Sequence, residues 1–430
     1  MTDKRKLLII TPIFPYPPQS GGQVRIFNIL KHVSRYFDVS LLSFSEKGQA
    51  SYLREVKPFC RRVETVAVEN GDRFSKMLSL AKPSQIVRNV KRITRWATGD
   101  PLRVCRFYHP EMERKLEMMV SEEGYDFVHA IYCQMAPYLA AAKALDGNIL
   151  AFMEDIDLSF VAAYREFQTR RGVGKALACM EYKRVKDYAL RVWPSFDRII
   201  VTSGVDREKV FGLSSGIGVS VVPNGVDTDH FQPMEVSGRS RKLAFLGGSL
   251  HYPNVDAVRY FCEHILARLH RDIPQISLKI VGDFAGSCID PAYASSVEFT
   301  GFVDDTRPHM ADCALLIVPL RIGGGTRLKI LEAMAMGVPV VSTSIGCEGI
   351  EVERDRNILI ADDPLEFADS IVAVLENETL HRSLSLNGRR LVEEKYDWRR
   401  IVAQMAQDYD EYATGAGAPS QMALNMAQGS

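Results

Sequence analysis

The chain has 430 residues, too many for one compact hydrophobic core, and this length favours two domains of about 200 residues each. Lysine plus arginine and aspartate plus glutamate each number 53, so the formal net charge is zero and no overall basic charge indicates a nucleic-acid partner. The eight cysteines include no Cys-x-x-Cys pair and no histidine pair has metal-ligand spacing, which predicts free thiols in a reducing cytosol and no bound metal.

Short apolar segments alternate with amphipathic ones, a pattern typical of helices that cover both faces of a parallel sheet. The first apolar run, Leu7 to Ile10, ends at Pro12 without a small-residue cleavage site, so it is predicted to be a strand and not a signal peptide. No segment approaches the roughly 20 apolar residues of a spanning helix. The predicted strands of the first half are 7–10, 39–44, 62–68, 127–131, 148–152, 198–202 and 220–222, and those of the second half are 242–246, 277–281, 297–300, 314–318, 339–342 and 357–360.

Turn-forming residues cluster in 223–233, between the two sets of strands. We therefore predict a first α/β domain over residues 1–235 and a second over 236–395. A helix over 396–413 is expected to pack back across the joint. The small, polar tail 414–430 is expected to be disordered, because it has little apolar surface to bury.

Two glycines, Gly21 and Gly22, follow the first predicted strand and precede a helix that begins near Val24. Because glycine has no Cβ, the backbone there can approach a ligand closely. Taken alone, the same residues are also compatible with a proline-rich surface loop that the glycines merely turn.

The segment 73–106 has nine cations against one acid, Asp100, and apolar residues lie among them. This mixture predicts an interfacial amphipathic helix that would attract anionic lipid headgroups. The alternative is a solvated helix that covers the first sheet. The cations are Arg73, Lys76, Lys82, Arg88, Lys91, Arg92, Arg95, Arg103 and Arg106.

A carboxylate cluster follows the predicted strand 148–152, at the edge of the sheet where ligands bind in open α/β folds. A carboxylate in this position, Asp155 or Asp157, could orient an acceptor hydroxyl or accept its proton. The alternative is that Asp157 or Ser159 caps the following helix. His129 ends an earlier strand and could touch substrate, although a lone histidine there is more often structural.

A glycine turn, Gly323 to Gly325, connects the predicted strand 314–318 to a helix. Free N–H groups and the positive end of the helix dipole favour an anion at this point, and Arg327 and Lys329 add two cations. Glu332, one turn further, could accept hydrogen bonds from sugar hydroxyls. A nucleoside diphosphate could bind the turn and its cations through phosphate oxygens and Glu332 through sugar hydroxyls. The alternative is a tight connection between strand and helix whose charged side chains are solvated.

Four motifs in this order resemble the retaining, nucleotide-sugar-dependent glycosyltransferases of family 4, and most of all bacterial sugar transferases of exopolysaccharide assembly. The resemblance implies the GT-B fold, two Rossmann-like domains with parallel sheets that face each other across a cleft. It also implies sugar transfer to a glycan or lipid-linked acceptor at the cytoplasmic face of the membrane, with no metal and no cofactor. The motifs are 15–25, 222–227, 299–303, and 329–341 followed by 348–350.

The resemblance also assigns residues to donor binding, in both domains. Two departures from the family pattern qualify the assignment. The first of two family glutamates falls on Gly324, and the usual arginine and lysine are missing from 245–254, so we expect Arg327 and Lys329 to compensate the charge of the leaving diphosphate. The implied donor-binding residues are Gly21, Gly22, Arg25, Gly325, Thr326, Arg327, Lys329, Glu332 and Glu348.

Much of the family has a catalytic histidine near residue 155, which this chain replaces with acids. We therefore predict Asp155 as the catalytic residue, with Asp157 second. The alternatives are a GT-B sugar-nucleotide epimerase and a catalytically inactive scaffold in a polysaccharide assembly complex. A nicotinamide dehydrogenase is disfavoured, because no Gly-x-Gly-x-x-Gly follows the first strand.

Overall fold

The computed structural model describes residues 4–46, 48–68, 83–214, 216–234 and 240–415. The chain divides into two compact units, Met1–Pro223 with Val402–Ser430, and Asn224–Ile401. The division therefore comes before the expected boundary at residue 235. The reason is a long-range pairing. Val226 forms a β-bridge with Asp397 and its N–H donates to the Tyr396 carbonyl at 2.8 Å, which ties the joint segment to the second unit.

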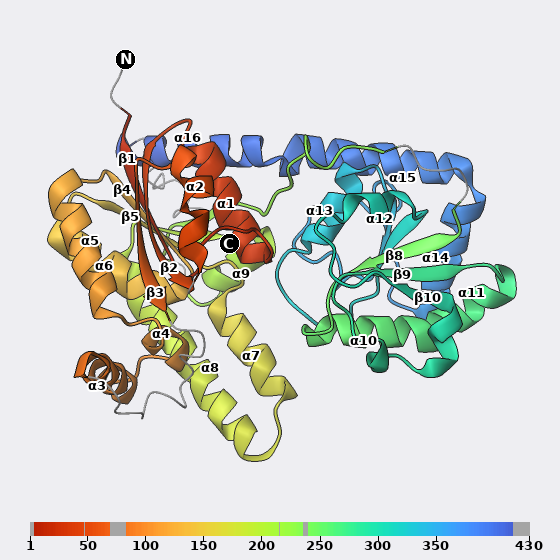
Figure 1. Ribbon diagram of the computed structural model, residues 1–430, viewed down its shortest axis with the longest axis horizontal. Coiled ribbons are helices and arrows are strands. Elements are labelled where there is room, and N and C mark those ends of the chain that lie inside the picture. The colour runs from red at the N-terminus through yellow and green to blue at the C-terminus, as the bar shows by residue number, and fades with distance from the viewer. Residues whose placement is uncertain (1–3, 47, 69–82, 215, 235–239, 416–430) are drawn as a thin grey trace, which may run out of the picture. The chain divides into compact units, whose positions relative to one another are not determined.

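The first unit is built on a seven-stranded parallel sheet with strand order β3-β2-β1-β4-β5-β6-β7 (Figure 1). Its strands are β1 (Lys6–Thr11), β2 (Asp38–Glu46), β3 (Arg62–Val68), β4 (Phe127–Ile131), β5 (Leu150–Glu154), β6 (Arg198–Val201) and β7 (Val219–Val221). Its helices are α1 (Gly21–Val33), α2 (Leu53–Val56), α3 (Pro83–Ala97), α4 (Leu102–Cys105), α5 (Pro110–Glu123), α6 (Ala136–Leu145), α7 (Ser159–Thr169), α8 (Gly172–Val192), α9 (Gly204–Phe211) and, from Val402, the end of α16 (Trp398–Ala413).

The second unit has a six-stranded parallel sheet with strand order β10-β9-β8-β11-β12-β13. Its strands are β8 (Lys242–Leu246), β9 (Ser277–Val281), β10 (Val297–Phe299), β11 (Leu315–Val318), β12 (Val340–Ser342) and β13 (Leu359–Ile360). Its helices are α10 (Tyr252–Tyr260), α11 (Ala267–Asp272), α12 (Arg307–Ala311), α13 (Leu328–Ala335), α14 (Pro364–Glu376) and α15 (Glu378–Leu391), with π-helical segments at Phe261–Leu266 and Val392–Tyr396.

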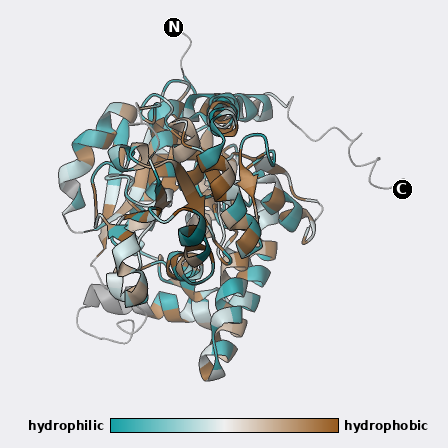
Figure 2. Cartoon of the chain, turned by 90° about the vertical axis from the view of Figure 1, so that its right-hand side faces the viewer, coloured by the Kyte–Doolittle hydropathy of each residue, from teal (hydrophilic) through white to brown (hydrophobic). Residues whose placement is uncertain are grey.

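The apolar runs become strands because helices cover both faces of each sheet, so that consecutive side chains are all buried. The segment Leu7–Ile10 is fully buried, and Ile9 pairs with Leu41 on one side and His129 on the other. In Figure 2 the strands are mostly brown and the outer faces of the helices carry most of the teal. The predicted fold class, two α/β sheets of parallel strands, is confirmed.

Both sheets reverse their winding direction beside a central strand, β1 in the first unit and β8 in the second. Ligands in doubly wound sheets bind beyond the carboxyl ends of the strands at such a point. The loops after β1, β4 and β5, and those after β8 and β11, are therefore the places to look for a functional site.

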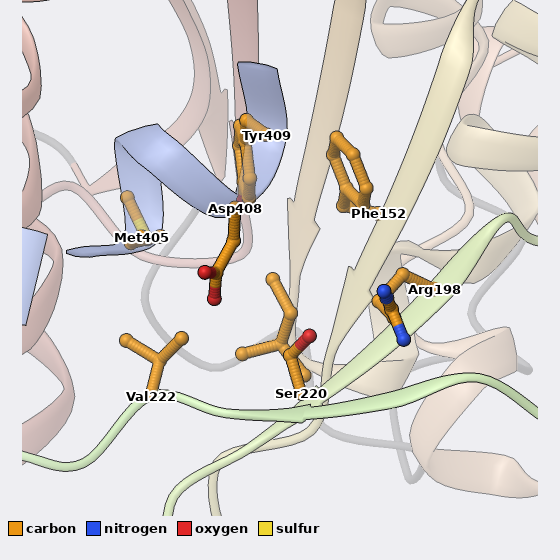
Figure 3. A pocket seen from close by; sticks show the side chains of 8 residues that line it. Phe152, Arg198, Ser220, Val222, Met405, Asp408 and Tyr409 are labelled. Atoms are coloured by element: carbon orange, nitrogen blue, oxygen red, sulfur yellow. The ribbon is translucent and has the colours of Figure 1, made fainter. Parts of the chain in front are cut away.

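The end of α16 packs on the first unit through aromatic side chains. The Tyr409 ring stacks on Phe152 with centroids 4.1 Å apart, and its hydroxyl lies 3.0 Å from His129 Nδ1. A narrow crevice remains beside Tyr409, between α16 and β5 to β7 (Figure 3). It is smaller than most sugar or nucleotide pockets, and apolar side chains form much of its lining, so we assign no ligand to it.

Candidate functional site

The connection from β11 to α13 in the second unit is a turn that requires glycine at two positions. Gly323 has φ of 131° and Gly325 has φ of 75°, conformations that side-chain-bearing residues rarely adopt. A Cβ added at Gly323 would lie 3.0 Å from Arg327 Nη2. Arg327 itself is the N-cap of α13, is 8% exposed, and donates from Nη1 to the Gly325 carbonyl. The turn is therefore folded around the guanidinium group.

Lys329 lies in the first turn of α13 and is held without an acidic partner. Its Nζ lies 3.3 Å from Asn254 Oδ1 and 4.6 Å from the centroid of the Phe245 ring. Burial and, to a smaller extent, the charge on Arg327 lower the pKa of Lys329 to about 7, while Glu332 opposes both effects. Lys329 has no ion pair with a carboxylate among the described residues, so a bound anion would favour the protonated form of this amine.

Glu332 follows Lys329 one helical turn later. Burial raises the pKa of Glu332 to about 7, and Lys329 opposes the shift. A carboxylate with this pKa can accept hydrogen bonds from hydroxyl groups near neutral pH. The predicted residues Gly325, Thr326, Arg327 and Lys329, with Glu332, are thus brought together by one turn and one helix.

His251 is a further member of the cluster that sequence analysis missed. It precedes α10, and burial lowers its pKa, with further lowering by Lys329 and Arg327. The charges of both cations therefore act on the His251 ring. In the sequence, Tyr252 and Pro253 indicate that a helix starts after β8, which locates the loop that contains His251. Nothing in the sequence indicates that this loop lies close to Lys329.

Asn254 is brought to Lys329 by close backbone packing. A Cβ at Gly247 would lie 2.6 Å from Asn254 Nδ2, which leaves only glycine at that position. The Asn254 amide donates to the Gly248 carbonyl at 3.0 Å, so its Oδ1 is oriented toward Lys329. The Thr326 hydroxyl oxygen is buried and has no hydrogen-bond partner among the described residues.

Glu348 lies apart from this turn in the sequence, in the loop after β12. It is half-buried, and its N–H donates to the Ile345 carbonyl at 3.4 Å. Its role in donor binding stays a prediction.

In the first unit, α1 begins at Gly21 and Gly22 directly after the Ser20 cap, which forms a capping box with Gln23. A Cβ at Gly22 would lie 2.1 Å from the Tyr132 hydroxyl oxygen. Tyr132 immediately follows β4 and has φ of 74°, a left-handed conformation that is costly for a bulky residue. Gly22 therefore accommodates the tyrosine, which sequence analysis did not identify.

Arg25, predicted as a donor-binding residue, is completely buried in a network within the first unit. Its Nε lies 2.7 Å from Glu154 Oε1, its Nη1 donates to the Pro223 carbonyl at 2.9 Å and its Nη2 donates to Val222 at 2.9 Å. His129 Nε2 lies 3.2 Å from Glu154 Oε2. This geometry favours a structural role for both Arg25 and His129.

Glu154 is ionised in this network. Burial alone would raise its pKa, but Arg25 and His129 outweigh burial and lower the pKa of Glu154 to about 2. The ion pair fixes the carboxyl end of β5, where the acidic loop begins.

Asp155 and Asp157, the two predicted catalytic acids, have different surroundings. Asp155 is buried and accepts from the Ser159 N–H at 2.9 Å and from the Ser159 hydroxyl at 2.8 Å. Burial raises the pKa of Asp155 to about 6 in spite of these bonds. The start of α7 is therefore held by Asp155, whereas Asp157 and Ser159 are the predicted capping residues. Asp157 is exposed. Burial raises the pKa of Tyr132, and the charge on Asp157 raises it further.

A substitution at Gly22 tests the packing against Tyr132. Gly22→Ala is expected to lower both the melting temperature and the catalytic rate, because overpacking of this kind costs about 1–3 kcal/mol. The double variant Gly22→Ala/Tyr132→Phe should recover much of the loss, since the nearest remaining ring atom lies 3.2 Å from the new methyl group. Gly174→Ala, which adds a methyl group in open space, is the control. An equal loss in the single and double variants would contradict this account.

Comparison with known proteins identifies the family. Residues 240–377, from before β8 to the end of α14, match the family model described as glycosyl transferases group 1. An uncharacterised 44.6 kDa protein in the cps region of Klebsiella pneumoniae is 24% identical over 424 residues, 94% of this chain and 99% of the relative. Residues 240–377 therefore belong to the group 1 glycosyltransferases.

Other relatives of the glycosyltransferase agree with this assignment. The MMP alpha-(1->4)-mannosyltransferase of Mycolicibacterium hassiacum is 28% identical over 428 residues, 87% of this chain and 98% of the relative. The crystal structure of Anabaena Alr3699/HepE in complex with UDP has a TM-score of 0.63 at 15% identity and covers 94% of this chain and 100% of its own. The resemblance predicted from the motifs is thus confirmed: the chain is a retaining GT-B glycosyltransferase that uses a nucleotide-sugar donor.

The basic segment 73–106 of the glycosyltransferase lies partly outside the described residues, which omit 69–82. Of its described cations, Arg92 is buried and donates to the Tyr108 carbonyl at 3.2 Å, and Arg95 binds Asp100 at 2.9 Å. Lys91 lies 3.7 Å from Glu113. Much of the described positive charge on α3 is therefore compensated within the fold.

All eight cysteines of the glycosyltransferase are free thiols. Within the described ranges, no three histidine, cysteine, aspartate or glutamate side chains are grouped closely enough to hold a metal ion. No helix of the same ranges has the length and apolar character to cross a membrane.

Proposed function

We propose that this glycosyltransferase moves a hexose from a nucleoside-diphosphate sugar to a hydroxyl group of a glycan or lipid-linked acceptor, in exopolysaccharide or cell-surface glycan synthesis at the cytoplasmic face of the membrane. The observation that carries the proposal is the cluster of Arg327, Lys329 and His251 at a helix start, where Lys329 has no acidic partner among the described residues. The cps region of the Klebsiella relative supports the pathway, and the UDP in the HepE crystal supports the class of donor.

The donor side of the mechanism is electrostatic. The diphosphate accepts hydrogen bonds from the N–H groups of the glycine turn and from Arg327 and Lys329, with the buried Thr326 hydroxyl as a further donor. Glu332 accepts from the hydroxyls of the ribose. As the glycosidic bond breaks, negative charge grows on the leaving diphosphate, and cations preorganised in a water-poor site stabilise it. The protein cations thus perform the charge compensation that other enzymes assign to a metal.

The acceptor side lies in the first unit, at the carboxyl ends of β4 and β5. Asp157 is exposed, its charge acts on Tyr132, and it can orient an acceptor hydroxyl. Both carboxylate oxygens of Asp155 are occupied by Ser159, so Asp155 supports the same loop from beneath. We therefore propose Asp157 as the residue in contact with the acceptor and Asp155 as its positioning residue.

A thermal-shift panel of UDP, GDP, ADP and their sugar conjugates tests the donor site. A ligand that binds only the folded state stabilises it by about 2.7 kcal/mol at 100 times its dissociation constant. We expect one base to raise the melting temperature, Glu332→Ala to remove the response, and Lys329→Ala to weaken it. Glu376→Ala, an exposed acid on α14, is the control. A response that survives unchanged in both site variants would refute the assignment.

Proton uptake on nucleotide binding provides a second test. In the free protein the pKa of Lys329 is about 7, so the side chain is mostly neutral at pH 8. A bound diphosphate favours the charged form, so each binding event should take up a proton, and affinity should fall as pH rises above 7. Calorimetric titration of UDP in two buffers of different ionisation enthalpy measures this uptake. The uptake should disappear in Lys329→Met, and an unchanged value there would contradict the prediction.

A further inference from the structure

The helical hairpin formed by α7 and α8 exposes apolar side chains around its tip. Figure 1 shows the two helices extending away from the seven-stranded sheet of the first unit. Val173 is 80% exposed, Leu177 is 58% exposed and Tyr164 is 41% exposed. Apolar side chains this exposed on one short element indicate a surface that a partner covers.

The same tip is positively charged in a chain whose formal net charge is zero. Between Tyr164 and Leu177 it has four cations, Arg165, Arg170, Arg171 and Lys175, and one acid, Glu166. Glu166 already binds Arg170 at 3.0 Å, whereas Arg171 is exposed and has no ion pair among the described residues. Lys175 lies 5.4 Å from the centroid of the Phe167 ring, so a cation and an aromatic ring are presented together.

The tip is surrounded by open space. A Cβ added at Gly172 or Gly174 would meet no atom within 4 Å. A convex end that mixes cations with valine, leucine and tyrosine suits a broad anionic surface with an apolar layer beneath it, which is the chemistry of a lipid bilayer. We propose that the tip of the α7–α8 hairpin docks on an anionic membrane surface.

Two contacts connect this docking surface to other parts of the first unit. Arg184 of α8 donates to the Trp96 carbonyl at 2.8 Å and lies 4.7 Å from the Trp96 ring, so α3 is fixed against the hairpin. The hairpin itself starts at Ser159, which Asp155 holds. A docked hairpin therefore brings the acidic loop toward the lipid surface, an advantage that rests on the proposed lipid-linked acceptor. Docking itself does not depend on that function.

Co-sedimentation with vesicles tests the inference, with phosphatidylcholine vesicles compared to vesicles that also contain phosphatidylglycerol. The full chain is expected to bind only the anionic vesicles, and more weakly at high salt. Arg171→Glu/Lys175→Glu should weaken binding roughly tenfold or more. Val173→Ser/Leu177→Ser should also weaken it. The matched controls Arg271→Glu and Leu386→Ser replace an exposed cation and an exposed leucine of the second unit and should bind like the wild type.

The hairpin variants should keep the wild-type melting temperature, because the replaced side chains are exposed. They should also keep the thermal response to UDP, which separates docking from donor binding. Equal binding to neutral vesicles, no binding to anionic vesicles, or wild-type binding by both hairpin variants would overturn the inference. Vesicle binding without transfer to any lipid-linked acceptor would refute the proposed acceptor and leave the docking surface intact.

Discussion

Replacing Lys329 by methionine is expected to weaken nucleoside-diphosphate binding about 10- to 100-fold, because a hydrogen bond to a charged group contributes about 1.5–3 kcal/mol. The transfer rate should fall further, by roughly 100- to 1,000-fold, because the leaving diphosphate loses a preorganised cation. Methionine keeps an apolar side chain over Phe245, so the fold should be preserved. Calorimetric titration with UDP and initial rates of donor consumption measure the two effects.

The melting temperature of the free Lys329→Met variant should stay the same or rise. The pKa of Lys329 is about 7 in the fold against an ordinary value of 10.5, so the unfolded chain binds more protons at pH 8 and the buried amine costs stability there. Lys395→Met, an exposed lysine of the second unit, is the control and should leave binding unchanged. If Lys329→Met loses nucleoside-diphosphate binding only because it unfolds, a direct role of Lys329 in binding would be contradicted.

Arg25→Met should produce the largest loss of stability among single substitutions considered for the first unit. It leaves the Glu154 carboxylate buried without its guanidinium partner, and breaking a buried pair in this way costs about 3–5 kcal/mol. Urea unfolding followed by far-ultraviolet circular dichroism measures the change. Arg5→Met is the matched control, because its ion pair with Asp410 is solvent-exposed and contributes little.

The double variant Arg25→Met/Glu154→Leu should recover much of the lost stability, since an apolar pair of similar volume avoids the unpaired charge. Acid dependence gives an independent check. The folded pKa of Glu154 is about 2 against an ordinary value of 4.5, so its stabilisation is present above pH 4.5 and is lost as pH falls toward 2. Equal losses of unfolding free energy in Arg25→Met and Arg5→Met would contradict the predicted contribution of the buried ion pair.

The fold could be predicted from the sequence because its determinants are local. Every predicted strand overlaps an observed one, since apolar runs bounded by turn residues form strands wherever helices cover both faces. The cluster of Arg327, Lys329 and Glu332 was predictable for the same reason, because five or fewer residues separate its members along one turn and helix.

Contacts between residues distant in sequence could not be predicted. Arg25 and Glu154 are separated by 129 positions, so nothing local distinguishes a buried arginine from one that awaits a phosphate. Tyr132 lacks a sequence signal for its left-handed φ, and its contact with Gly22 depends on β1 and β4 lying side by side. The domain boundary was placed late because the pairing of Val226 with Asp397 joins segments far apart in the chain.

Hydrogen exchange measured by mass spectrometry, with and without saturating UDP, GDP or ADP, tests most directly whether the donor binds at the turn between β11 and α13. The diphosphate is held there by backbone N–H groups, so the account predicts slower exchange in peptides that span Gly323 to Ala335, and no slowing in Lys329→Met. Protection confined to other peptides while calorimetry shows full saturation would contradict it.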